Sequence, residues 1–271
     1  MTFSIITVNY NNKEGLRQTI ESIENLCSSN YEYIIIDGGS TDGSVDIIKK
    51  HEKSISYWVS EKDSGIYNAM NKGLQQAKGE FVNFMNSGDT FYSTDVLDKI
   101  EPYLNGNDLI IGKEYHEDPI SGESATTFLP NRLSMATFVV SFLPHQSGFI
   151  RRTLFNEMLY DEKLRIVSDW KFYLIQTVYK NCSIKLIDTI VSRREQGGIS
   201  NSAEELNKKE RRQVLKELLP PGVLKDYDSL ANLDKTTLFK LLNLCDDDNS
   251  RKLLTYSIKI INRICKYFKK T

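Results

Sequence analysis

The sequence predicts an α/β fold, with a mostly parallel central sheet and helices on both faces. In the first half of the chain, short apolar runs alternate with segments whose apolar positions recur at helical spacing. Polar or glycine-rich loops follow three of these runs. That placement is typical of parallel sheets, in which ligands bind beyond the carboxyl ends of the strands. The length of 271 residues allows one large domain with an appendage.

Alternating strands and helices are predicted from residue 3 to residue 112. The strands are expected at residues 3–8, 31–37, 55–60, 80–86 and 108–112. The helices between them are expected at residues 13–26, 43–50, 66–77 and 93–104. Because βαβ crossovers are right-handed, these helices should cover both faces of the sheet.

The second half of the chain is less regular. Residues 131–152 are expected to contain a short helix, a loop and an edge element of the sheet. Residues 168–180 have the pattern of an amphipathic helix with Asp169 in its first turn, and residues 184–194 have that of a strand. We expect the sheet domain to span residues 1–200.

Residues 201–271 are expected to form a helical C-terminal extension. Their composition is helical and charged, and Pro220 and Pro221 interrupt the pattern. At helical spacing, residues 251–270 separate an apolar face from a face of seven Lys and Arg residues. Such a basic amphipathic helix binds the interface of an anionic membrane. The alternative is a helix that packs on the body and keeps a solvated basic face.

The charge and the apolar pattern narrow the class of protein. The net charge is −1, and without residues 251–271 the chain has 28 basic against 36 acidic side chains, so no nucleic-acid partner is expected. No apolar run approaches the ~20 residues that span a bilayer, and the first residues lack the features of a signal peptide. The four cysteines form no CxxC pair and are expected to be free thiols. We expect a cytoplasmic protein, peripheral at the inner face of the cell membrane.

Several motifs of common enzyme classes are missing. The sequence contains no GxxxxGK[ST], HExxH or GxSxG, and no GxGxxG follows the first strand. Their absence argues against a P-loop nucleotidase, a zinc protease, a serine hydrolase and a dinucleotide-binding oxidoreductase.

The tetrapeptide Asn86-Ser87-Gly88-Asp89 is a candidate metal site. It directly follows the fourth predicted strand. A carboxylate such as Asp89 at this position can bind a hard divalent cation, which in turn can bridge phosphate oxygens. The alternative is an ordinary turn, since these residue types also favour tight turns.

Other polar residues of the predicted strand ends and helices are candidates for binding or catalysis. Asp37 ends a buried strand before a glycine-rich loop, where it could accept hydrogen bonds from a base or a ribose, or simply cap a turn. Asn68 and Asn71 lie in a predicted helix that they do not favour, which indicates a ligand or a buried backbone contact. Asp169 could be a general base, or a carboxylate stabilised by the helix dipole.

Seven segments, in this order, resemble family 2 glycosyltransferases of the GT-A fold, whose central sheet is Rossmann-like. The segments are SIITVNYN, IIIDGGSTDGS, SEKDSGIYNAMNKG, FVNFMNSGD, PHQSGFIRR, SDWKFYL and QGGIS. Together they extend over about residues 3–200. The nearest likeness is to the bacterial exopolysaccharide and O-antigen branch, which includes the colanic-acid glycosyltransferases. Residues 201–271 match nothing in this family.

The resemblance implies an inverting glycosyltransferase that uses a nucleotide-diphosphate sugar, expected to be a UDP-sugar. The residues that match its nucleotide-sugar side are Asn9, Tyr10, Asn11, Asp37, Asp63, Asn86 and Ser87. Asp89 matches the metal ligand for Mn²⁺ or Mg²⁺, although the family's Asp-x-Asp is here Asn-x-Gly followed by Asp. Asp169 matches the catalytic base. The acceptor side is matched by His145 and Gln146, and a loop that closes over the donor by Gln196, Gly197 and Gly198.

Three functional hypotheses follow. The first is transfer of a sugar to a hydroxyl of a glycan acceptor, expected to be lipid-linked, in surface polysaccharide biosynthesis (O-antigen, capsule or exopolysaccharide). The second is a non-catalytic sugar-nucleotide or glycan-binding protein of the same fold, which the altered Asp-x-Asp motif suggests. The third is a methyltransferase, which the loop IIIDGGSTDG suggests, but this loop lacks the further glycines of such enzymes and leaves Asp89 unexplained.

Overall fold

The structure is a computed structural model, and its contacts divide the chain into two compact units. The first unit comprises residues 1–129 and 143–217, and the second comprises residues 130–142 and 218–271. The structure describes residues 1–117, 122–130, 133–140, 142–194, 204–231, 248–252, 255–257 and 259. The expected division of the chain after residue 200 stays a prediction.

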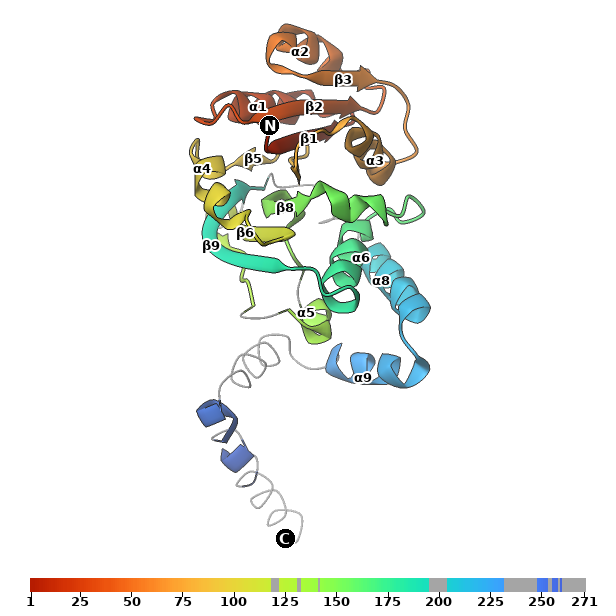
Figure 1. Cartoon of the computed structure of the whole chain (residues 1–271). Helices are drawn as coiled ribbons and strands as arrows, with labels where there is room; N and C mark the ends of the chain where they lie inside the picture. Colours follow the sequence, from red (N-terminus) through yellow and green to blue (C-terminus); the bar gives the residue numbers. More distant parts are fainter. Residues whose placement is uncertain are drawn as a thin grey trace. The chain divides into compact units, whose positions relative to one another are not determined.

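The strands and helices predicted for the first half are confirmed, with small shifts at their ends (Figure 1). The strands are β1 (Phe3–Asn9), β2 (Tyr31–Asp37), β3 (Tyr57–Ser60), β4 (Phe81–Phe84) and β6 (Leu109–Glu117). The helices are α1 (Lys13–Glu24), α2 (Ser44–Lys50), α3 (Ile66–Gln76) and α4 (Val96–Ile100), and α4 continues as a 3₁₀ turn over Glu101–Tyr103. The short strand β5 (Thr90–Phe91) was not predicted.

The second half of the chain adds further elements. Those of the first unit are β7 (Ser124–Thr126), the 3₁₀ turn η3 (His145–Ser147), β8 (Gly148–Arg151), α6 (Ser168–Leu174), β9 (Ile184–Arg193) and α8 (Glu204–Leu218). A π-helical turn over Ile175–Tyr179 extends α6, so the predicted helix with Asp169 in its first turn is confirmed. The second unit contains α5 (Met135–Val140) and α9 (Pro221–Ala231).

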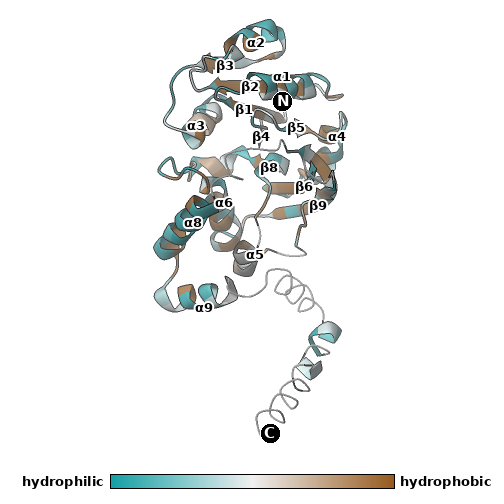
Figure 2. Ribbon diagram, turned by 180° about the vertical axis from the view of Figure 1, so that it is seen from behind, coloured by the Kyte–Doolittle hydropathy of each residue, from teal (hydrophilic) through white to brown (hydrophobic). Residues whose placement is uncertain are grey.

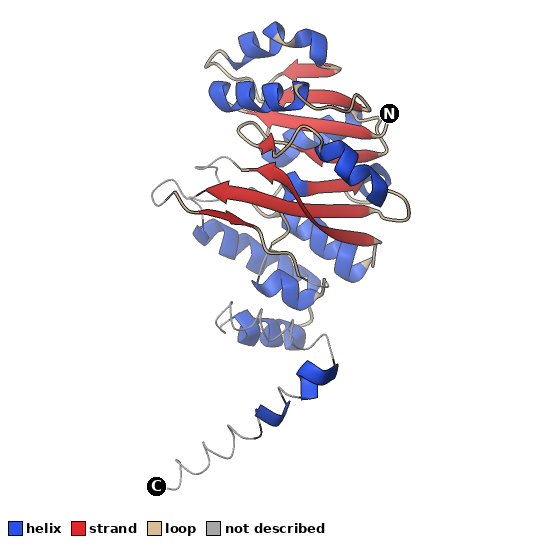
Figure 3. Cartoon of the chain, turned by 90° about the vertical axis from the view of Figure 1, so that its left-hand side faces the viewer, coloured by secondary structure: helices blue, strands red, loops and turns tan. Residues whose placement is uncertain are grey.

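The described strands form one sheet in the order β3-β2-β1-β4-β8-β6-β9-β5, with β7 beside β6 (Figure 3). Strands β3, β2, β1 and β4 are parallel, and so are β6 and β9. The mostly parallel sheet is therefore confirmed. The edge element expected within residues 131–152 is wrong, because β8 lies between β4 and β6 and is antiparallel to both. Its apolar residues Phe149 and Ile150 are fully buried, as a central strand requires.

Successive side chains of a strand point to opposite faces of the sheet, so helices can pack on both faces of the parallel strands. Ile5 and Ile35 belong to the core formed with α1, α2 and α4. On the opposite face, Ile6 and Ile36 contact Gly73 of α3. The side chains predicted to share one helix face are all buried: Leu16, Ile20 and Ile23 of α1, and Leu26 just beyond the end of α1. In Figure 2, the central strands are coloured largely as hydrophobic, whereas α2 and α8 carry many hydrophilic residues.

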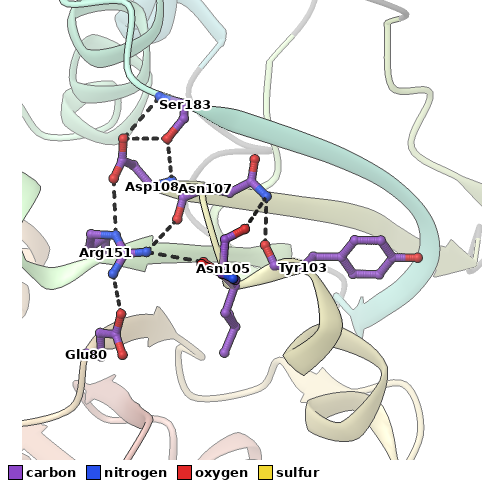
Figure 4. A network of polar contacts seen from close by, with 8 residues as sticks. Glu80, Tyr103, Asn105, Asn107, Asp108, Arg151 and Ser183 are labelled. Atoms are coloured by element: carbon purple, nitrogen blue, oxygen red, sulfur yellow. Dashed lines mark hydrogen bonds and ion pairs between the residues drawn. The ribbon is translucent and has the colours of Figure 1, made fainter.

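A polar network fixes the strand ends opposite the predicted ligand-binding edge (Figure 4). Arg151, at the end of β8, donates to Asp108 at 3.1 Å and also bonds Glu80. It further donates to the carbonyl oxygens of Leu104 and Asn107. The four groups belong to the segments that lead into β4 and β6, so one guanidinium ties these strands to β8.

In the C-terminal segment, the predicted break is confirmed, since α8 ends at Leu218 and α9 begins at Pro221. Proline suits the first position of a helix because its missing N–H would have no partner there. Most of residues 251–270 lie outside the described residues, so the amphipathic tail stays a prediction. No helix in the described part of the chain has the length and apolar run that a bilayer crossing requires.

Candidate active site

The carboxyl ends of β1, β2 and β4 bring the predicted donor residues to one edge of the sheet. Asn9 at the end of β1 lies directly opposite Asp37 at the end of β2. The pairing of β4 with β1 continues beyond β4, because the Ser87 N–H donates to the Val8 carbonyl at 3.1 Å. The Asn86–Asp89 turn is therefore held beside the end of β1.

Asp37 organises the loops at this edge. Its buried carboxylate accepts hydrogen bonds from the Asn9 amide at 2.7 Å, and from the hydroxyls of Ser40 and Ser60, each at 2.6 Å. The backbone N–H groups of Gly39 and Ser40 also donate to it. Burial opposes ionisation, but these hydrogen bonds outweigh it and lower the pKa of Asp37. Direct recognition of a base or ribose by Asp37 stays a prediction.

Tyr10, Gly38 and Asp63 lie close together beside Asp37. A β-carbon added to Gly38 would lie 2.6 Å from Asp63 Oδ2 and 3.2 Å from Tyr10 Cδ2. The Tyr10 side chain is 67% exposed, which is unusual for an aromatic ring at the end of a buried strand. The exposed Tyr10 ring and the Asp63 carboxylate therefore lie beside Gly38, which has no side chain to fill the space between them.

The loop around residue 11 is held by side-chain hydrogen bonds. Asn11 has a left-handed backbone with φ of 49°. Its side-chain oxygen accepts from the Thr41 N–H at 2.8 Å, and its own N–H donates to the Ser40 hydroxyl at 2.8 Å. These contacts join the loop after β1 to the loop after β2.

The Asn86–Asp89 turn is tight and is anchored by Thr19 of α1. The Asp89 N–H donates to the Asn86 carbonyl at 2.9 Å. Gly88 has φ of 103°, a conformation that side chains disfavour. The Thr19 hydroxyl accepts from the Gly88 N–H at 2.9 Å and donates to the Asp89 carbonyl at 2.7 Å. The sequence reasoning missed Thr19, because it lies 70 residues before Asp89.

Asp169 lies partly buried at the start of α6, with a side chain that is 19% exposed, between two donors. The Tyr67 hydroxyl donates to Asp169 Oδ1 at 2.8 Å, and His145 Nδ1 lies 3.4 Å from Oδ2. Burial alone would raise the pKa of Asp169, but His145 and Tyr67 lower it. Burial likewise disfavours the charged form of His145, but Asp169 and the further carboxylates Asp89 and Glu114 raise the pKa of that imidazole.

The turn η3 connects Asp169 with the Asn86–Asp89 turn. His145 Nε2 lies 3.0 Å from the side-chain nitrogen of Asn86. The neighbouring Gln146 donates from Nε2 to Asp89 Oδ2 at 2.9 Å. Two consecutive residues therefore link the predicted base with the predicted metal ligand. Their predicted place on the acceptor side is not tested by these contacts and stays a prediction.

Two helix asparagines hold the segment that precedes α6. Asn71 exchanges two hydrogen bonds with the backbone of Tyr160, at 2.9 and 3.1 Å. Asn68 and Asn71 both donate to the carboxylate of Glu162. Of the two alternatives open from the sequence, the buried backbone contact is therefore confirmed for Asn71.

Glu114 of β6 is a second buried acid that the sequence did not single out. It is 1% exposed, and burial raises its pKa although Arg194 Nε lies 3.4 Å from Oε1. Its neighbours Lys113 and Tyr115 on β6 are half-buried, and the sequence around Glu114 carries no signal that singles it out. The loop residues Gln196, Gly197 and Gly198 follow Arg194 and lie outside the described residues.

The side chains at this edge fit a divalent cation that is shared with a ligand. In the part of the chain that the structure describes, no three His, Cys, Asp or Glu side chains converge into a cage. Mg²⁺ sites commonly use one or two carboxylates together with substrate phosphates and water. Asp89 provides one carboxylate, and the buried Asn86 Oδ1 has no hydrogen-bond partner among the described residues. The donor set therefore suits a cation that arrives with a diphosphate.

The chain is similar in sequence to known glycosyltransferases. The family model "Glycosyl transferase family 2" matches residues 4–159, more than half of the chain. The chain is 31% identical over 186 residues to the uncharacterized glycosyltransferase Rv1514c of Mycobacterium tuberculosis, which covers 64% of this chain and 68% of that protein. The protein is thus a glycosyltransferase by class, and it belongs to glycosyl transferase family 2.

Solved structures share the fold at low sequence identity. TarS residues 1–349 of S. aureus, in complex with UDP-GlcNAc, superpose with a TM-score of 0.64 at 19% identity, covering 88% of this chain and 69% of that one. The mannosyltransferase PcManGT of Pyrobaculum calidifontis, in complex with GDP-Man and Mn²⁺, superposes with a TM-score of 0.64 at 12% identity. The match covers 95% of this chain and 79% of that one. The GT-A fold implied by the sequence is thereby confirmed.

Proposed function

We propose that the protein is an inverting, metal-dependent glycosyltransferase that moves a sugar from a UDP-sugar to a hydroxyl of a glycan acceptor. One observation carries this proposal. Asp169, a partly buried carboxylate with a lowered pKa, is joined through His145 and Gln146 to the turn that holds Asp89. A base and a diphosphate-side carboxylate are thus held in one connected site.

Asp169 would act as the general base. Its lowered pKa keeps the carboxylate ionised near neutral pH. The acceptor oxygen forms a bond to the anomeric carbon as the bond from that carbon to the diphosphate oxygen breaks, and the hydroxyl proton passes to Asp169. A single displacement of this kind inverts the anomeric carbon and needs no second carboxylate as a nucleophile.

Asp89 would hold Mn²⁺ or Mg²⁺ together with the diphosphate of the donor. When bound, the cation supplies positive charge to the departing diphosphate. The Thr19 hydroxyl and the tight turn fix the Asp89 backbone, so the carboxylate is presented without rearrangement of the loop. The complex of PcManGT with GDP-Man and Mn²⁺ supports this assignment.

The nucleotide would bind at the corner formed by Tyr10, Gly38 and Asp63. The exposed Tyr10 ring can stack on a base, and the Asp63 carboxylate can accept a hydrogen bond from it. Asp37 would act through the loops that it organises, because the protein already supplies it with five donors. Asn9 and Asn11 would share this role. The UDP-GlcNAc bound to TarS supports a UDP-sugar donor.

The acceptor would be a lipid-linked glycan of surface polysaccharide biosynthesis, met at the inner face of the cell membrane. The support is the resemblance to the exopolysaccharide branch, together with the seven cations of residues 251–270. An anionic leaflet would attract those cations and bring the catalytic unit to a lipid-anchored acceptor. His145 and Gln146, and the loop at Gln196, Gly197 and Gly198, stay proposed acceptor and donor-closing residues.

A thermal-shift screen of UDP-, GDP- and dTDP-sugars, with and without Mn²⁺, tests the proposal. We expect stabilisation by UDP-sugars that depends on Mn²⁺, followed by transfer to a lipid-linked acceptor. Donor binding with neither hydrolysis nor transfer would favour the non-catalytic alternative. Stabilisation by S-adenosylmethionine and by no sugar nucleotide would favour a methyltransferase.

A further inference from the structure

Gln146 makes a contact with Asp89 that orients its charge without neutralising it. The Gln146 amide donates to Asp89 Oδ2 at 2.9 Å, and the two side chains are 8% and 7% exposed. A neutral amide leaves the full negative charge of the carboxylate in place, whereas a Lys or Arg at this position would compete with a cation. The contact therefore restricts the carboxylate rotamer while preserving its capacity to bind metal.

The backbone of Gln146 is itself fixed to the strand that leads to Asp89. Asn83 of β4 donates from its side-chain nitrogen to the carbonyl oxygens of Gln146 and Gly148, each at 2.9 Å. Asn83 is fully buried. Asn83 lies on β4, six residues before Asp89, so the strand that leads into the Asn86–Asp89 turn also anchors the residue that orients the carboxylate.

The rest of η3 leaves little freedom for this arrangement to shift. The Ser147 hydroxyl lies 2.9 Å from the Lys113 carbonyl oxygen of β6 and 2.6 Å from the Ser192 hydroxyl of β9. A β-carbon on Gly148 would lie 2.5 Å from the Tyr173 hydroxyl, so the chain passes this point in close contact with α6. Strands β4, β6 and β9 all hold the same turn.

We propose that Gln146 is a positioning residue for the donor-bound cation: it sets the Asp89 carboxylate for the cation and the diphosphate, and Asn83 anchors it. This rests on the function proposed above. Residues in such supporting positions around a metal ligand typically change metal affinity or activity by about 10- to 100-fold when they are replaced. The altered Asp-x-Asp motif, with one carboxylate, makes the orientation of that carboxylate correspondingly more important.

The test is Gln146→Met in the full chain, because methionine keeps the length of the side chain and removes the amide. Mn²⁺ is titrated in the presence of UDP, and bound Mn²⁺ is followed by the loss of its free EPR signal. We expect the half-saturating Mn²⁺ concentration to rise about tenfold. In transfer assays, the KM for the donor should rise at low Mn²⁺, and kcat should recover at saturating Mn²⁺.

The matched control is Gln176→Met, which removes another buried glutamine amide. Gln176 is 1% exposed, and its side chain donates a 3.4 Å contact to the Leu154 carbonyl. It should lower thermal stability without changing Mn²⁺ half-saturation. If Gln146→Met does not fold, Gln146→Asn takes its place, since its amide is one methylene too short to reach Asp89.

Two outcomes overturn the inference, and they are distinguishable. If the wild-type chain binds Mn²⁺ with UDP and a folded Gln146 variant binds it equally well, the positioning role is wrong and the proposed function stands. If the wild-type chain binds Mn²⁺ with none of UDP, GDP and dTDP, the proposed metal-dependent function fails, and the inference fails with it.

Discussion

Tyr67 of α3 donates a 2.8 Å hydrogen bond to Oδ1 of Asp169, across 102 residues of sequence. Burial, together with the charge of Asp169, holds the pKa of the Tyr67 hydroxyl well above its ordinary value. The hydroxyl therefore stays protonated and continues to donate. Oδ1 of Asp169 therefore accepts a short hydrogen bond from Tyr67, whereas Oδ2 has the longer contact, 3.4 Å, with His145 Nδ1. We expect Oδ2 to be the oxygen that receives the acceptor proton.

Asp169→Asn should abolish transfer and preserve donor binding. An amide keeps the size of the side chain but cannot take the proton, and loss of a general base typically costs about a hundredfold or more in rate. The measurements are sugar transfer and the thermal shift with UDP-sugar and Mn²⁺. Asp161→Asn is the control, because Asp161 precedes α6 and pairs at 2.7 Å with Lys171, which lies on the same helix as Asp169. Substantial turnover in Asp169→Asn would place the base elsewhere.

The pair formed by His145 and Asp169 should make stability depend on pH. Because the folded-state pKa of His145 is raised, its contribution is complete below the unfolded value of about 6.5 and is lost as pH rises through the folded value. The pKa of Asp169 is lowered, so its contribution is present above an unfolded value of about 3.9 and is lost as pH falls through the folded value.

The melting temperatures of wild type and His145→Gln therefore should differ most near about pH 6 and converge as pH rises through the raised pKa of His145. The variant also loses the contact between His145 Nε2 and the Asn86 side chain. The comparison His51→Gln serves as a control, since His51 pairs with Glu24 outside the candidate site. A difference between wild type and His145→Gln that grows with pH would contradict the expected charge state.

Gly38→Ala should weaken nucleotide binding more than it weakens the fold. The added methyl group would lie 2.6 Å from Asp63 Oδ2 and 3.2 Å from the Tyr10 ring, so both side chains must move. Since both belong to the proposed base-binding corner and can rotate outward, we expect about a tenfold weaker UDP affinity, or ~1.4 kcal/mol, by calorimetry. Gly222→Ala, where the methyl group meets nothing within 4 Å, is the control. Unchanged affinity in Gly38→Ala would exclude this corner.

Arg151→Met should lower the stability of the sheet and leave the rate of sugar transfer unchanged. Methionine retains packing against the Phe81 ring, over which the guanidinium lies at 4.5 Å. It removes the guanidinium donors to Asp108 and Glu80 and to the carbonyl groups of Leu104 and Asn107. We expect a loss of about 2 kcal/mol in urea unfolding. Transfer per folded molecule should not change, because the network lies at the opposite strand ends. A selective loss of activity would show coupling between the two edges.

The parallel part of the sheet and the ligand-binding edge were predictable because their signals are local. Apolar runs such as residues 31–37 mark strands, and the turn residues of Asn86–Asp89 follow directly in the chain. Strand β8 gave a weaker signal, since four residues do not reveal whether a strand is central or antiparallel. Its position depends on pairing with β4 and β6, which lie far away in the sequence.

The contacts that build the site were not predictable for the same reason. Thr19 reads as one polar residue of an amphipathic helix, and Asn83 reads as an interruption of an apolar strand. Their partners, Asp89 and Gln146, lie 70 and 63 residues away. Buried polar side chains must find partners, so Asn83 within an apolar run was the available clue, but nothing local named its partner.

Truncation after Ser250 should weaken binding to anionic vesicles and leave the sheet unit folded. The removed residues carry seven cations and no acid, and each cation near an anionic leaflet contributes about 1 kcal/mol. Sedimentation with vesicles of anionic and of neutral lipid, for the full and truncated chains, measures the effect, and salt should weaken binding of the full chain. Because the removed segment lies outside the first compact unit, donor-dependent thermal shifts should survive. Equal binding of both chains to anionic vesicles would refute the membrane role, and would leave a helix packed on the body as the explanation of the basic face.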